Sequence, residues 1–330
     1  MKLRHACHAI FLFLLLVPVS AQALLPDTSP GWHALSLQHD RLERHFRYFV
    51  PTNLAMHPDL VLLFHGGTQS MRKIFRKRAG GSQEWEHLAS ENGFLLLTPN
   101  GVNLRNGDTE GDRQNWNDCR VAVEGDNSAS TADDIGFVRA LIDWAKVQFD
   151  INESRVYTTG ASNGGLMSLR LVTELSDRIA AAAVFIANQP VESDCIAPLH
   201  PVPLFMMSGT EDPLMLWDGG QIRDKGPMMM SAPATRDFWL KVNHADKTRV
   251  KTELLPDVDN INSSAIIRNI YPAQPGGQPL WFYEVRGGGH TMPSMKYDVP
   301  FLARVLVGNQ NRDLEGTHEA WTFLRQFTKE

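Results

Sequence analysis

A serine flanked by glycines is the clearest chemical signal in this sequence. Residues 160–164 read Gly-Ala-Ser-Asn-Gly, between a short apolar run at 156–159 and a helix-like segment at 166–171. A sharp strand-to-helix turn of this kind exposes the serine hydroxyl, and the two glycines let strand and helix pass closely. The five-residue pattern alone is weak, but its position between a strand and a helix makes it specific. We predict that Ser162 is a nucleophile.

Such a nucleophile needs a base and an acid. A serine hydroxyl is inert at neutral pH until an imidazole takes its proton, and a carboxylate must orient that imidazole. Where the serine lies on such a turn, the acid and then the histidine follow it along the chain. Asp212 comes shortly after the apolar run 204–208 and before a proline, with Glu211 and Asp218 as nearby competitors. We predict that Asp212 is the orienting acid; the alternative is that it only caps a turn.

A histidine after three glycines is the candidate base. Three histidines follow Asp212, of which His244 ends a predicted helix and His318 begins another, both ordinary positions for a surface histidine. His290 instead follows residues 287–289, Gly-Gly-Gly, directly after the last predicted strand. Consecutive glycines indicate a backbone that approaches another part of the protein closely. We therefore predict that His290 is the base.

Acyl transfer also requires hydrogen-bond donors for the oxyanion of the tetrahedral intermediate. One predicted donor is the backbone N–H of Asn163, next to the nucleophile. The second is predicted in the loop after an early strand, where residues 65–68 read His-Gly-Gly-Thr. Glycine permits the tight backbone geometry, and the donor is the N–H of Gly67 or of Thr68, a choice that the sequence leaves open. By itself this segment also fits an ordinary turn at the end of a strand.

Alternating strand-like and helix-like segments must position these residues. Such alternation is typical of a mostly parallel central sheet with helices on both faces. An antiparallel edge strand is predicted at 45–50 from its alternating aromatic residues. Buried strands are predicted at 60–64, 94–98, 156–159, 181–186, 204–208 and 280–285, and amphipathic helices at 135–149, 232–242 and 320–327. No linker or repeat divides the chain, so we predict a single domain, residues 24–330, with an α/β-hydrolase fold.

Three long polar segments follow predicted strands, at 100–131, 211–231 and 286–316. Loops at the carboxyl ends of parallel strands form the binding crevice of such folds, so we expect these segments to cover a substrate cleft. Trp116 and Trp217 lie on them and offer flat surfaces on which a sugar or an aromatic acid could stack. Packing in the protein interior is the alternative for both rings.

The N-terminus has the pattern of an export signal. Lys2 and Arg4 precede an apolar run at 10–17, and residues 21–23, Ala-Gln-Ala, offer a small-x-small cleavage site. The apolar run is far shorter than the ~20 residues that span a bilayer. We predict a signal peptide at 1–23, no membrane span, and a secreted or periplasmic mature chain.

Cys119 and Cys195 are the cysteines of the predicted mature chain. In an oxidising compartment we expect them to form a disulfide. The closed loop of ~76 residues would contribute about 4.5 kcal/mol in the chain-entropy model. The alternative is two free buried thiols.

The charge of the chain limits its partners. The 330 residues carry a formal net charge of −5. A mildly acidic chain without a basic run argues against nucleic acid or an anionic membrane as a partner. Acidic residues gather at 108–126 but lack the spacing of a calcium loop, so we expect no metal and no other cofactor. The oligomeric state is left open.

Several motifs together resemble one family. They lie at 65–67 (His-Gly-Gly), 116–119 (Trp-Asn-Asp-Cys), 133–137 (Asp-Asp-Ile-Gly-Phe), 160–165 (Gly-Ala-Ser-Asn-Gly-Gly), 209–213 (Gly-Thr-Glu-Asp-Pro) and 287–291 (Gly-Gly-Gly-His-Thr). In this order they resemble the secreted polyhydroxybutyrate depolymerases and feruloyl esterases. The resemblance covers residues 44 to 325, nearly the whole predicted mature chain.

This resemblance implies an α/β-hydrolase fold, metal-free hydrolysis of carboxylic esters, and Ser162, Asp212 and His290 as the catalytic triad. The implied substrates are small-molecule or oligomeric esters, either hydroxyalkanoate oligomers or feruloyl and acetyl esters of plant polysaccharide. A serine peptidase and a non-catalytic carbohydrate-binding protein on the same scaffold are the alternatives.

One position departs from the family pattern. The family often has a tryptophan two residues after the histidine, where this chain has Met292, which indicates an altered cleft wall. Together with Trp116 and Trp217, we count His65 and Met292 as candidate substrate-binding residues.

Overall fold

The computed structural model describes residues 26–76, 80–121, 130–195, 198–222, 226–258 and 263–329. The predicted signal peptide, 1–23, lies outside these ranges.

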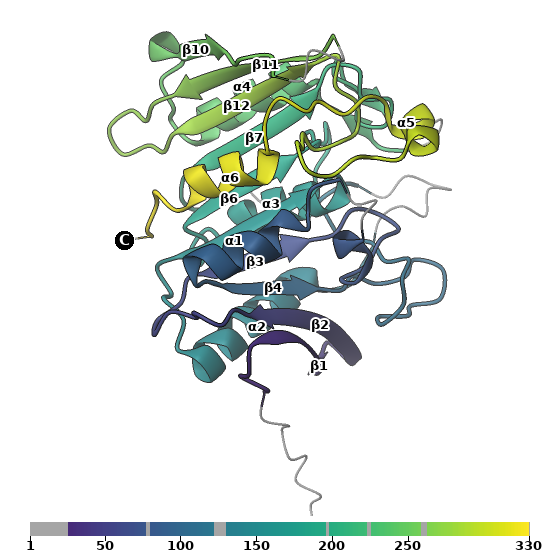
Figure 1. Cartoon of the computed structure of the whole chain (residues 1–330), viewed down its shortest axis with the longest axis vertical. Helices are drawn as coiled ribbons and strands as arrows, with labels where there is room; N and C mark the ends of the chain where they lie inside the picture. The colour runs from purple at the N-terminus through teal and green to yellow at the C-terminus, as the bar shows by residue number, and fades with distance from the viewer. Residues whose placement is uncertain are drawn as a thin grey trace, which may run out of the picture.

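A ten-stranded sheet runs through the length of the molecule (Figure 1). In spatial order its strands are β1 (Gly31–His39), β2 (Leu42–Val50), β4 (Leu95–Pro99), β3 (Leu60–Phe64), β5 (Val156–Ala161), β6 (Ala181–Phe185), β7 (Leu204–Gly209), β12 (Leu280–Arg286), β11 (Ala265–Tyr271) and β10 (Lys251–Leu254). The neighbours from β4 to β12 pair in parallel. The strands at the two edges are antiparallel. A separate two-stranded ribbon joins β8 (Gly220–Gln221) to β9 (Met228–Met229).

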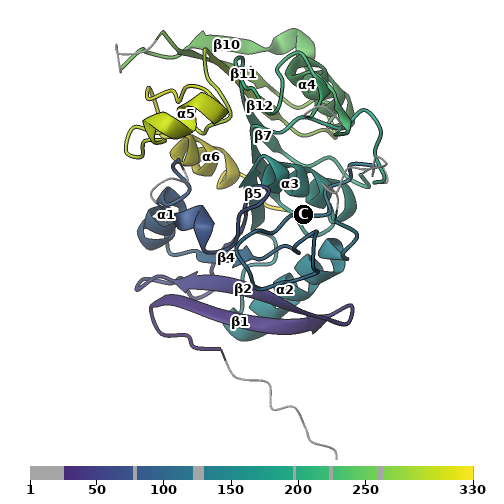
Figure 2. The same cartoon turned by 90° about the vertical axis from the view of Figure 1, so that its right-hand side faces the viewer.

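Helices cover both faces of the sheet (Figure 2). One face carries α2 (Asp134–Phe149), α3 (Asn163–Glu174) and α4 (Ala232–Val242), and the other carries α1 (Glu84–Asn92), α5 (Phe301–Val307) and α6 (Gly316–Leu324). Two short 3-10 turns lie at Lys73–Phe75 and Lys247–Arg249. The molecule therefore has three layers, with a hydrophobic core on each side of the sheet.

The central strands are apolar throughout because both of their faces are covered. Every residue of β3, β4, β6 and β7 is buried. Along β3 the side chains alternate between the two cores: Leu60, Leu62 and Phe64 belong to one, and Val61 and Leu63 to the other. A continuous apolar run, rather than an alternating one, is the expected pattern for such strands.

The predicted elements are present with shifts of a few residues at their ends, and the sheet is mostly parallel with helices on both faces, as predicted. Seven of the strands and α-helices were not predicted from the sequence: β1, β8, β9, β10, β11, α1 and α5. Three of the four residues of β10 are exposed, and α1 buries the charged Glu84 among its apolar residues. The strand β10 therefore lacks the apolar alternation on which such predictions depend. In α1 the apolar residues Trp85, Leu88 and Ala89 do have helical spacing, but charged residues surround them.

Candidate active site

A pocket of about 180 Å³ opens beside the carboxyl ends of the central strands. Parallel strands end at the same edge of the sheet, so the residues that follow β3, β5, β6 and β12 meet there although they are distant in sequence. Ser162 and His290 both line this pocket. Much of its remaining wall is apolar and includes Trp85, Phe185 and Met292.

Ser162 lies on a sharp turn between β5 and α3. Its backbone has φ 57° and ψ −124°, a conformation that L-residues seldom adopt and that costs of order 1–3 kcal/mol. The Ser162 N–H donates to the carbonyl oxygen of Phe185 at 3.0 Å, which anchors the turn to β6. A Cβ on Gly164 would lie 2.2 Å from the carbonyl oxygen of Phe64, and one on Gly160 would lie 2.5 Å from that of Gly164. Both flanking glycines are thus required by the close approach of neighbouring backbones.

His290 is hydrogen-bonded to Asp212. Its Nδ1 lies 2.7 Å from Oδ2 of that carboxylate, whose side chain is 1% exposed. The other oxygen, Oδ1, accepts the N–H groups of Leu214 (2.8 Å) and Met215 (2.7 Å). Because Nδ1 is bonded to the carboxylate, Nε2 is the ring nitrogen that can accept or donate a proton at the pocket. Between the described side chains of Ser162 and His290 there is no direct hydrogen bond, but apo active sites often tighten only when substrate binds.

The loops that carry this acid and this histidine are bonded to each other. β7 and β12 pair in parallel, so the loops that follow them leave the sheet side by side. The N–H of Glu211 donates to the carbonyl oxygen of Gly288 at 2.9 Å, and the N–H of Gly287 donates to Oγ1 of Thr210 at 3.0 Å. The glycines before His290 therefore serve close backbone contact, as predicted. Glu211 and Asp218, the competing acids, are exposed, and neither has a hydrogen bond to the imidazole in the described structure.

The His-Gly-Gly-Thr loop lies beside the start of α3. The Thr68 N–H donates to Oδ1 of Asn115 at 3.1 Å. A Cβ on Gly67 would lie 3.0 Å from the same oxygen and 3.6 Å from Cβ of Asn163. Asn163 is the first residue of α3, and the first N–H groups of a helix have no partner within it.

Two expected substrate contacts are wrong, because the side chains concerned are fully buried. His65 is 0% exposed; its Nδ1 lies 2.8 Å from the carbonyl oxygen of Gly66, and its Nε2 accepts the N–H of Gly101 at 3.1 Å. Burial lowers the pKa of this imidazole to about 4, so it is neutral. Trp116 is also 0% exposed, and its indole N–H donates to the carbonyl oxygen of His65 at 2.9 Å. Both rings have a structural role.

Of the two other candidate substrate contacts, one lines the pocket and one does not. Trp217 is half-buried, packs against Phe282 with ring centroids 6.0 Å apart, and is not among the residues that line the pocket. Met292 does line it. Trp85 also lines it, although it lies outside the three long polar segments from which the candidate tryptophans were chosen.

Only one of those segments contributes to the pocket as described. From 286–316 come His290, Met292 and two residues of α5, Ala303 and Val307. The described residues of 100–131 and 211–231 do not line it, whereas several residues between 66 and 85 do. The outer face of α5 is apolar and exposed, with Val305 77% exposed.

The predicted disulfide is present. Cys119 and Cys195 are bonded, with their Cα atoms 5.2 Å apart. The bond ties the segment that follows Trp116 to the loop after β6.

Within the described ranges, no group of three or more His, Cys, Asp or Glu side chains is arranged to hold a metal ion. Three described acids of the 108–126 cluster form ion pairs instead: Glu110 with Arg72 at 3.6 Å, Asp112 with Arg76 at 3.2 Å and Asp118 with Arg120 at 2.8 Å. In the same part of the chain, no helix has the length and apolar character needed to cross a membrane.

The sheet topology and the strained serine turn define an α/β-hydrolase fold. The acetyl xylan esterase from Aspergillus awamori has this architecture, with a TM-score of 0.52 and 14% identity; the alignment covers 78% of this chain and 94% of that protein. At this identity the likeness concerns the fold alone.

Sequence relatives are esterases. The chain is 28% identical over 200 residues to the putative esterase NocK of Nocardia uniformis subsp. tsuyamanensis, over 58% of this chain and 57% of that protein. It is 26% identical over 173 residues to the bifunctional acetylxylan esterase/xylanase XynS20E of Neocallimastix patriciarum, over 52% of this chain and 22% of that protein. It is 27% identical over 165 residues to feruloyl esterase B of Piromyces equi, over 48% and 29% respectively.

The chain therefore spans less than two thirds of the length of these relatives. No protein-family model matches it. The chain is related to acetylxylan esterases, feruloyl esterases and putative esterases, which agrees with the predicted resemblance.

Proposed function

We propose that this protein is an exported serine esterase that hydrolyses carboxylic esters through an acyl-enzyme, with Ser162, His290 and Asp212 as its triad. The observation that carries the proposal is the 2.7 Å contact between Nδ1 of His290 and the buried Asp212, at a pocket that this histidine shares with the strained Ser162. Base, orienting acid and nucleophile then have the roles that acyl transfer requires.

In the first half of the reaction, Oγ of Ser162 attacks the ester carbonyl carbon while Nε2 of His290 accepts the hydroxyl proton. The carbonyl oxygen becomes an oxyanion, which the N–H groups of Asn163 and Gly67 stabilise. Asp212 keeps the imidazole oriented and stabilises its positive charge. When the tetrahedral intermediate collapses, the bond to the alcohol oxygen breaks and His290 delivers the proton to that oxygen.

In the second half, water attacks the acyl-enzyme. His290 accepts a proton from the water, a second oxyanion forms, and its collapse releases the acid and returns the proton to Oγ of Ser162. We assign the second oxyanion donor to Gly67 because the N–H of Thr68 already donates to Asn115.

The described lining of the pocket favours an uncharged ester. None of its described residues is Asp, Glu, Lys or Arg, and the wall includes Trp85, Phe185, Met292 and Val299. Together with the relatives, this supports feruloyl and acetyl esters of polysaccharide as substrates. Hydroxyalkanoate oligomers, which the sequence resemblance implies, also have uncharged ester units that match this lining. The disulfide supports an oxidising compartment and hence a secreted or periplasmic enzyme.

A direct test is hydrolysis by the purified protein of p-nitrophenyl acetate, methyl ferulate, hydroxybutyrate trimer and acetylated xylan. We expect turnover of at least one ester and covalent labelling by a fluorophosphonate, both lost in Ser162→Ala. Cleavage of a peptide-amide panel without ester turnover would instead identify a peptidase. Binding of xylan with neither turnover nor labelling would identify a carbohydrate-binding protein.

A further inference from the structure

We infer that Asp118, a buried acid that does not face the pocket, is a positioning residue for the oxyanion hole and acts through the side chain of Asn163. The inference rests on the proposed function and goes further, since it assigns a role to a residue outside the triad and the donor groups. The acid belongs to the segment 115–119, to which both donor-bearing loops are bonded.

The Asn163 side chain is held on every polar atom. Its Oδ1 accepts the N–H of Trp116 at 2.9 Å, and its Nδ2 donates to the carbonyl oxygen of Trp116 at 3.3 Å. The same Nδ2 donates to Oδ2 of Asp118. Asn163 is only 5% exposed, so solvent does not compete for these bonds. The residue that offers its backbone N–H beside the nucleophile therefore has its side chain locked.

Asp118 can hold this amide because its own charge is compensated. Its side chain is fully buried, and Oδ1 accepts Nε–H of Arg120 at 2.8 Å, while Oδ2 accepts the amide of Asn163. A carboxylate offers acceptors only, and here two donors approach two different oxygens. An asparagine at 118 would keep the shape but direct an NH₂ group at one of these donors.

The second donor loop is bonded to the same segment. Oδ1 of Asn115 accepts the N–H of Thr68 at 3.1 Å, and the indole of Trp116 donates to the carbonyl oxygen of His65 at 2.9 Å. Gly67 lies against the side chains of Asn115 and Asn163. The segment thus fixes the two donor loops relative to each other, although they lie almost a hundred residues apart in the sequence.

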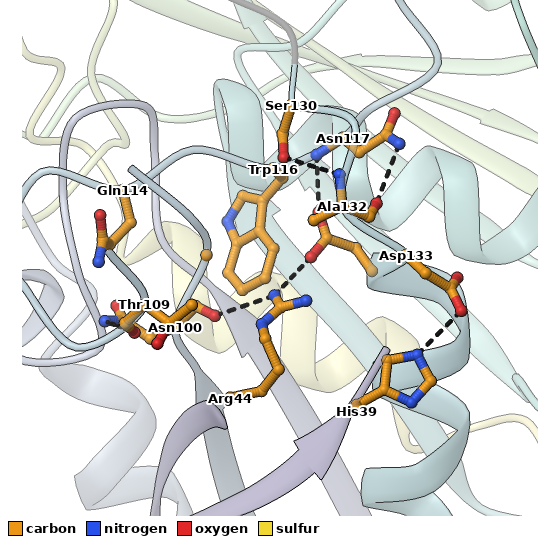
Figure 3. A network of polar contacts seen from close by, with 12 residues as sticks. His39, Arg44, Asn100, Thr109, Gln114, Trp116, Asn117, Ser130, Ala132 and Asp133 are labelled. Carbon is orange, nitrogen blue, oxygen red and sulfur yellow. Dashed lines mark hydrogen bonds and ion pairs between the residues drawn. The ribbon is translucent and has the colours of Figure 1, made fainter. Parts of the chain in front are cut away.

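The segment itself is anchored on both sides. On one side the N–H of Asn117 donates to Oδ2 of Asp134 at 2.7 Å, and its side-chain amide donates to the carbonyl oxygen of Ala132 at 3.0 Å (Figure 3). Asp134 is in turn paired with Arg44 of β2, both fully buried. On the other side, Cys119 is bonded to Cys195. A support of this rigidity suits a site in which a misplacement of about 1 Å costs roughly a hundredfold in rate.

The test compares Asp118→Asn with wild type in kcat, in KM for p-nitrophenyl acetate, and in inhibition by an alkyl trifluoromethyl ketone. The serine Oγ adds to the carbonyl carbon of this ketone, and the resulting oxyanion occupies the oxyanion hole. We expect kcat to fall about 10- to 100-fold and the inhibition constant to rise by a similar factor, because both depend on the oxyanion. KM should stay within about threefold, because ground-state binding does not depend on the oxyanion.

Asp59→Asn is the matched control. Asp59 is also a partly buried acid that accepts the Nε–H of an arginine, Arg155, at 2.8 Å. It precedes β3, at the end of the sheet remote from the pocket. Both substitutions should lower the melting temperature, but only Asp118→Asn should change kcat and inhibition. If Asp118→Asn does not fold, Asn163→Ala tests the same link, because it removes the locked amide and keeps the backbone N–H.

The inference is overturned if folded Asp118→Asn keeps both kcat and ketone inhibition within about twofold of wild type, or if Asp59→Asn lowers kcat to the same extent. Failure of the proposed function is distinguishable, because it appears in the wild-type protein as absence of ester turnover and of fluorophosphonate labelling; the inference then falls with it.

Discussion

Asp212 and His290 are separated by 78 positions in the sequence, yet Oδ2 of the first lies 2.7 Å from Nδ1 of the second. The contact exists because β7 and β12, which lie just before these residues, are adjacent parallel strands. Two N–H groups, of Leu214 and Met215, hold the other carboxylate oxygen. The carboxylate is therefore fixed before substrate arrives.

Replacing Asp212 by asparagine should lower kcat for p-nitrophenyl acetate by roughly 10³- to 10⁴-fold with little change in KM. The amide no longer stabilises the imidazolium, and it favours the wrong tautomer of His290. Steady-state kinetics measure the effect. Asp218→Asn, at an exposed acid in the same loop, is the control and should retain wild-type kcat. Equal losses in both variants would remove Asp212 from the triad.

Burial of His65 should make stability depend on pH. Its pKa in the folded protein is about 4, below the ordinary value of 6.5. Between these values the unfolded chain binds the proton more readily than the folded one, so the free energy of unfolding should fall as pH drops from 6.5 towards 4. The contribution lost is up to roughly 3 kcal/mol. Urea unfolding of wild type and His65→Gln at several pH values measures it, and the variant should lose this part of the pH dependence. An identical dependence in the variant would contradict the assignment.

Loss of the disulfide should destabilise the protein. The Cys119→Ala/Cys195→Ala double variant is expected to have a free energy of unfolding about 4.5 kcal/mol below that of the oxidised wild type, since the bond restricts the unfolded chain. Denaturant unfolding with and without a phosphine reductant measures this. Reductant should lower the stability of wild type and leave that of the double variant unchanged; a wild type indifferent to reductant would speak against a stabilising bond.

The pocket wall at α5 should control the size of the acyl group. Ala303 lines the pocket, whereas Val305, two residues further along, is 77% exposed on the outer face of the same helix. Ala303→Trp should reduce kcat/KM for p-nitrophenyl octanoate at least about tenfold relative to the acetate, because the added ring occupies the space of the longer chain. Val305→Trp should leave that ratio unchanged. A shift of equal size in both variants would show that α5 does not define the acyl site.

Parts of the candidate site could be predicted because they depend on local patterns. The turn around Ser162 needs glycines at two fixed positions. In the structure, backbone atoms of neighbouring segments occupy the space that a side chain would take at each of them. The glycines before His290 have a similar cause, contact with the loop of Asp212. Local constraints of this kind leave a readable trace in the sequence.

The surroundings of the site could not be predicted in the same way. Trp116 and Trp85 are both fully buried tryptophans, yet only the second lines the pocket. Their difference depends on which segments pack over them. Edge strands such as β10 likewise leave little apolar pattern, since most of their residues face solvent.

The sequence by itself indicated the proposed order of nucleophile, acid and base. It also predicted the mostly parallel sheet and the pairing of Cys119 with Cys195, which the structure confirms. Only the tertiary structure decided that His65 and Trp116 are internal supports, that α5 lines the pocket, and that Asp118 reaches Asn163. The physical reason is range: backbone geometry is set by neighbours in the chain, whereas burial and long-range hydrogen bonds depend on how distant segments pack.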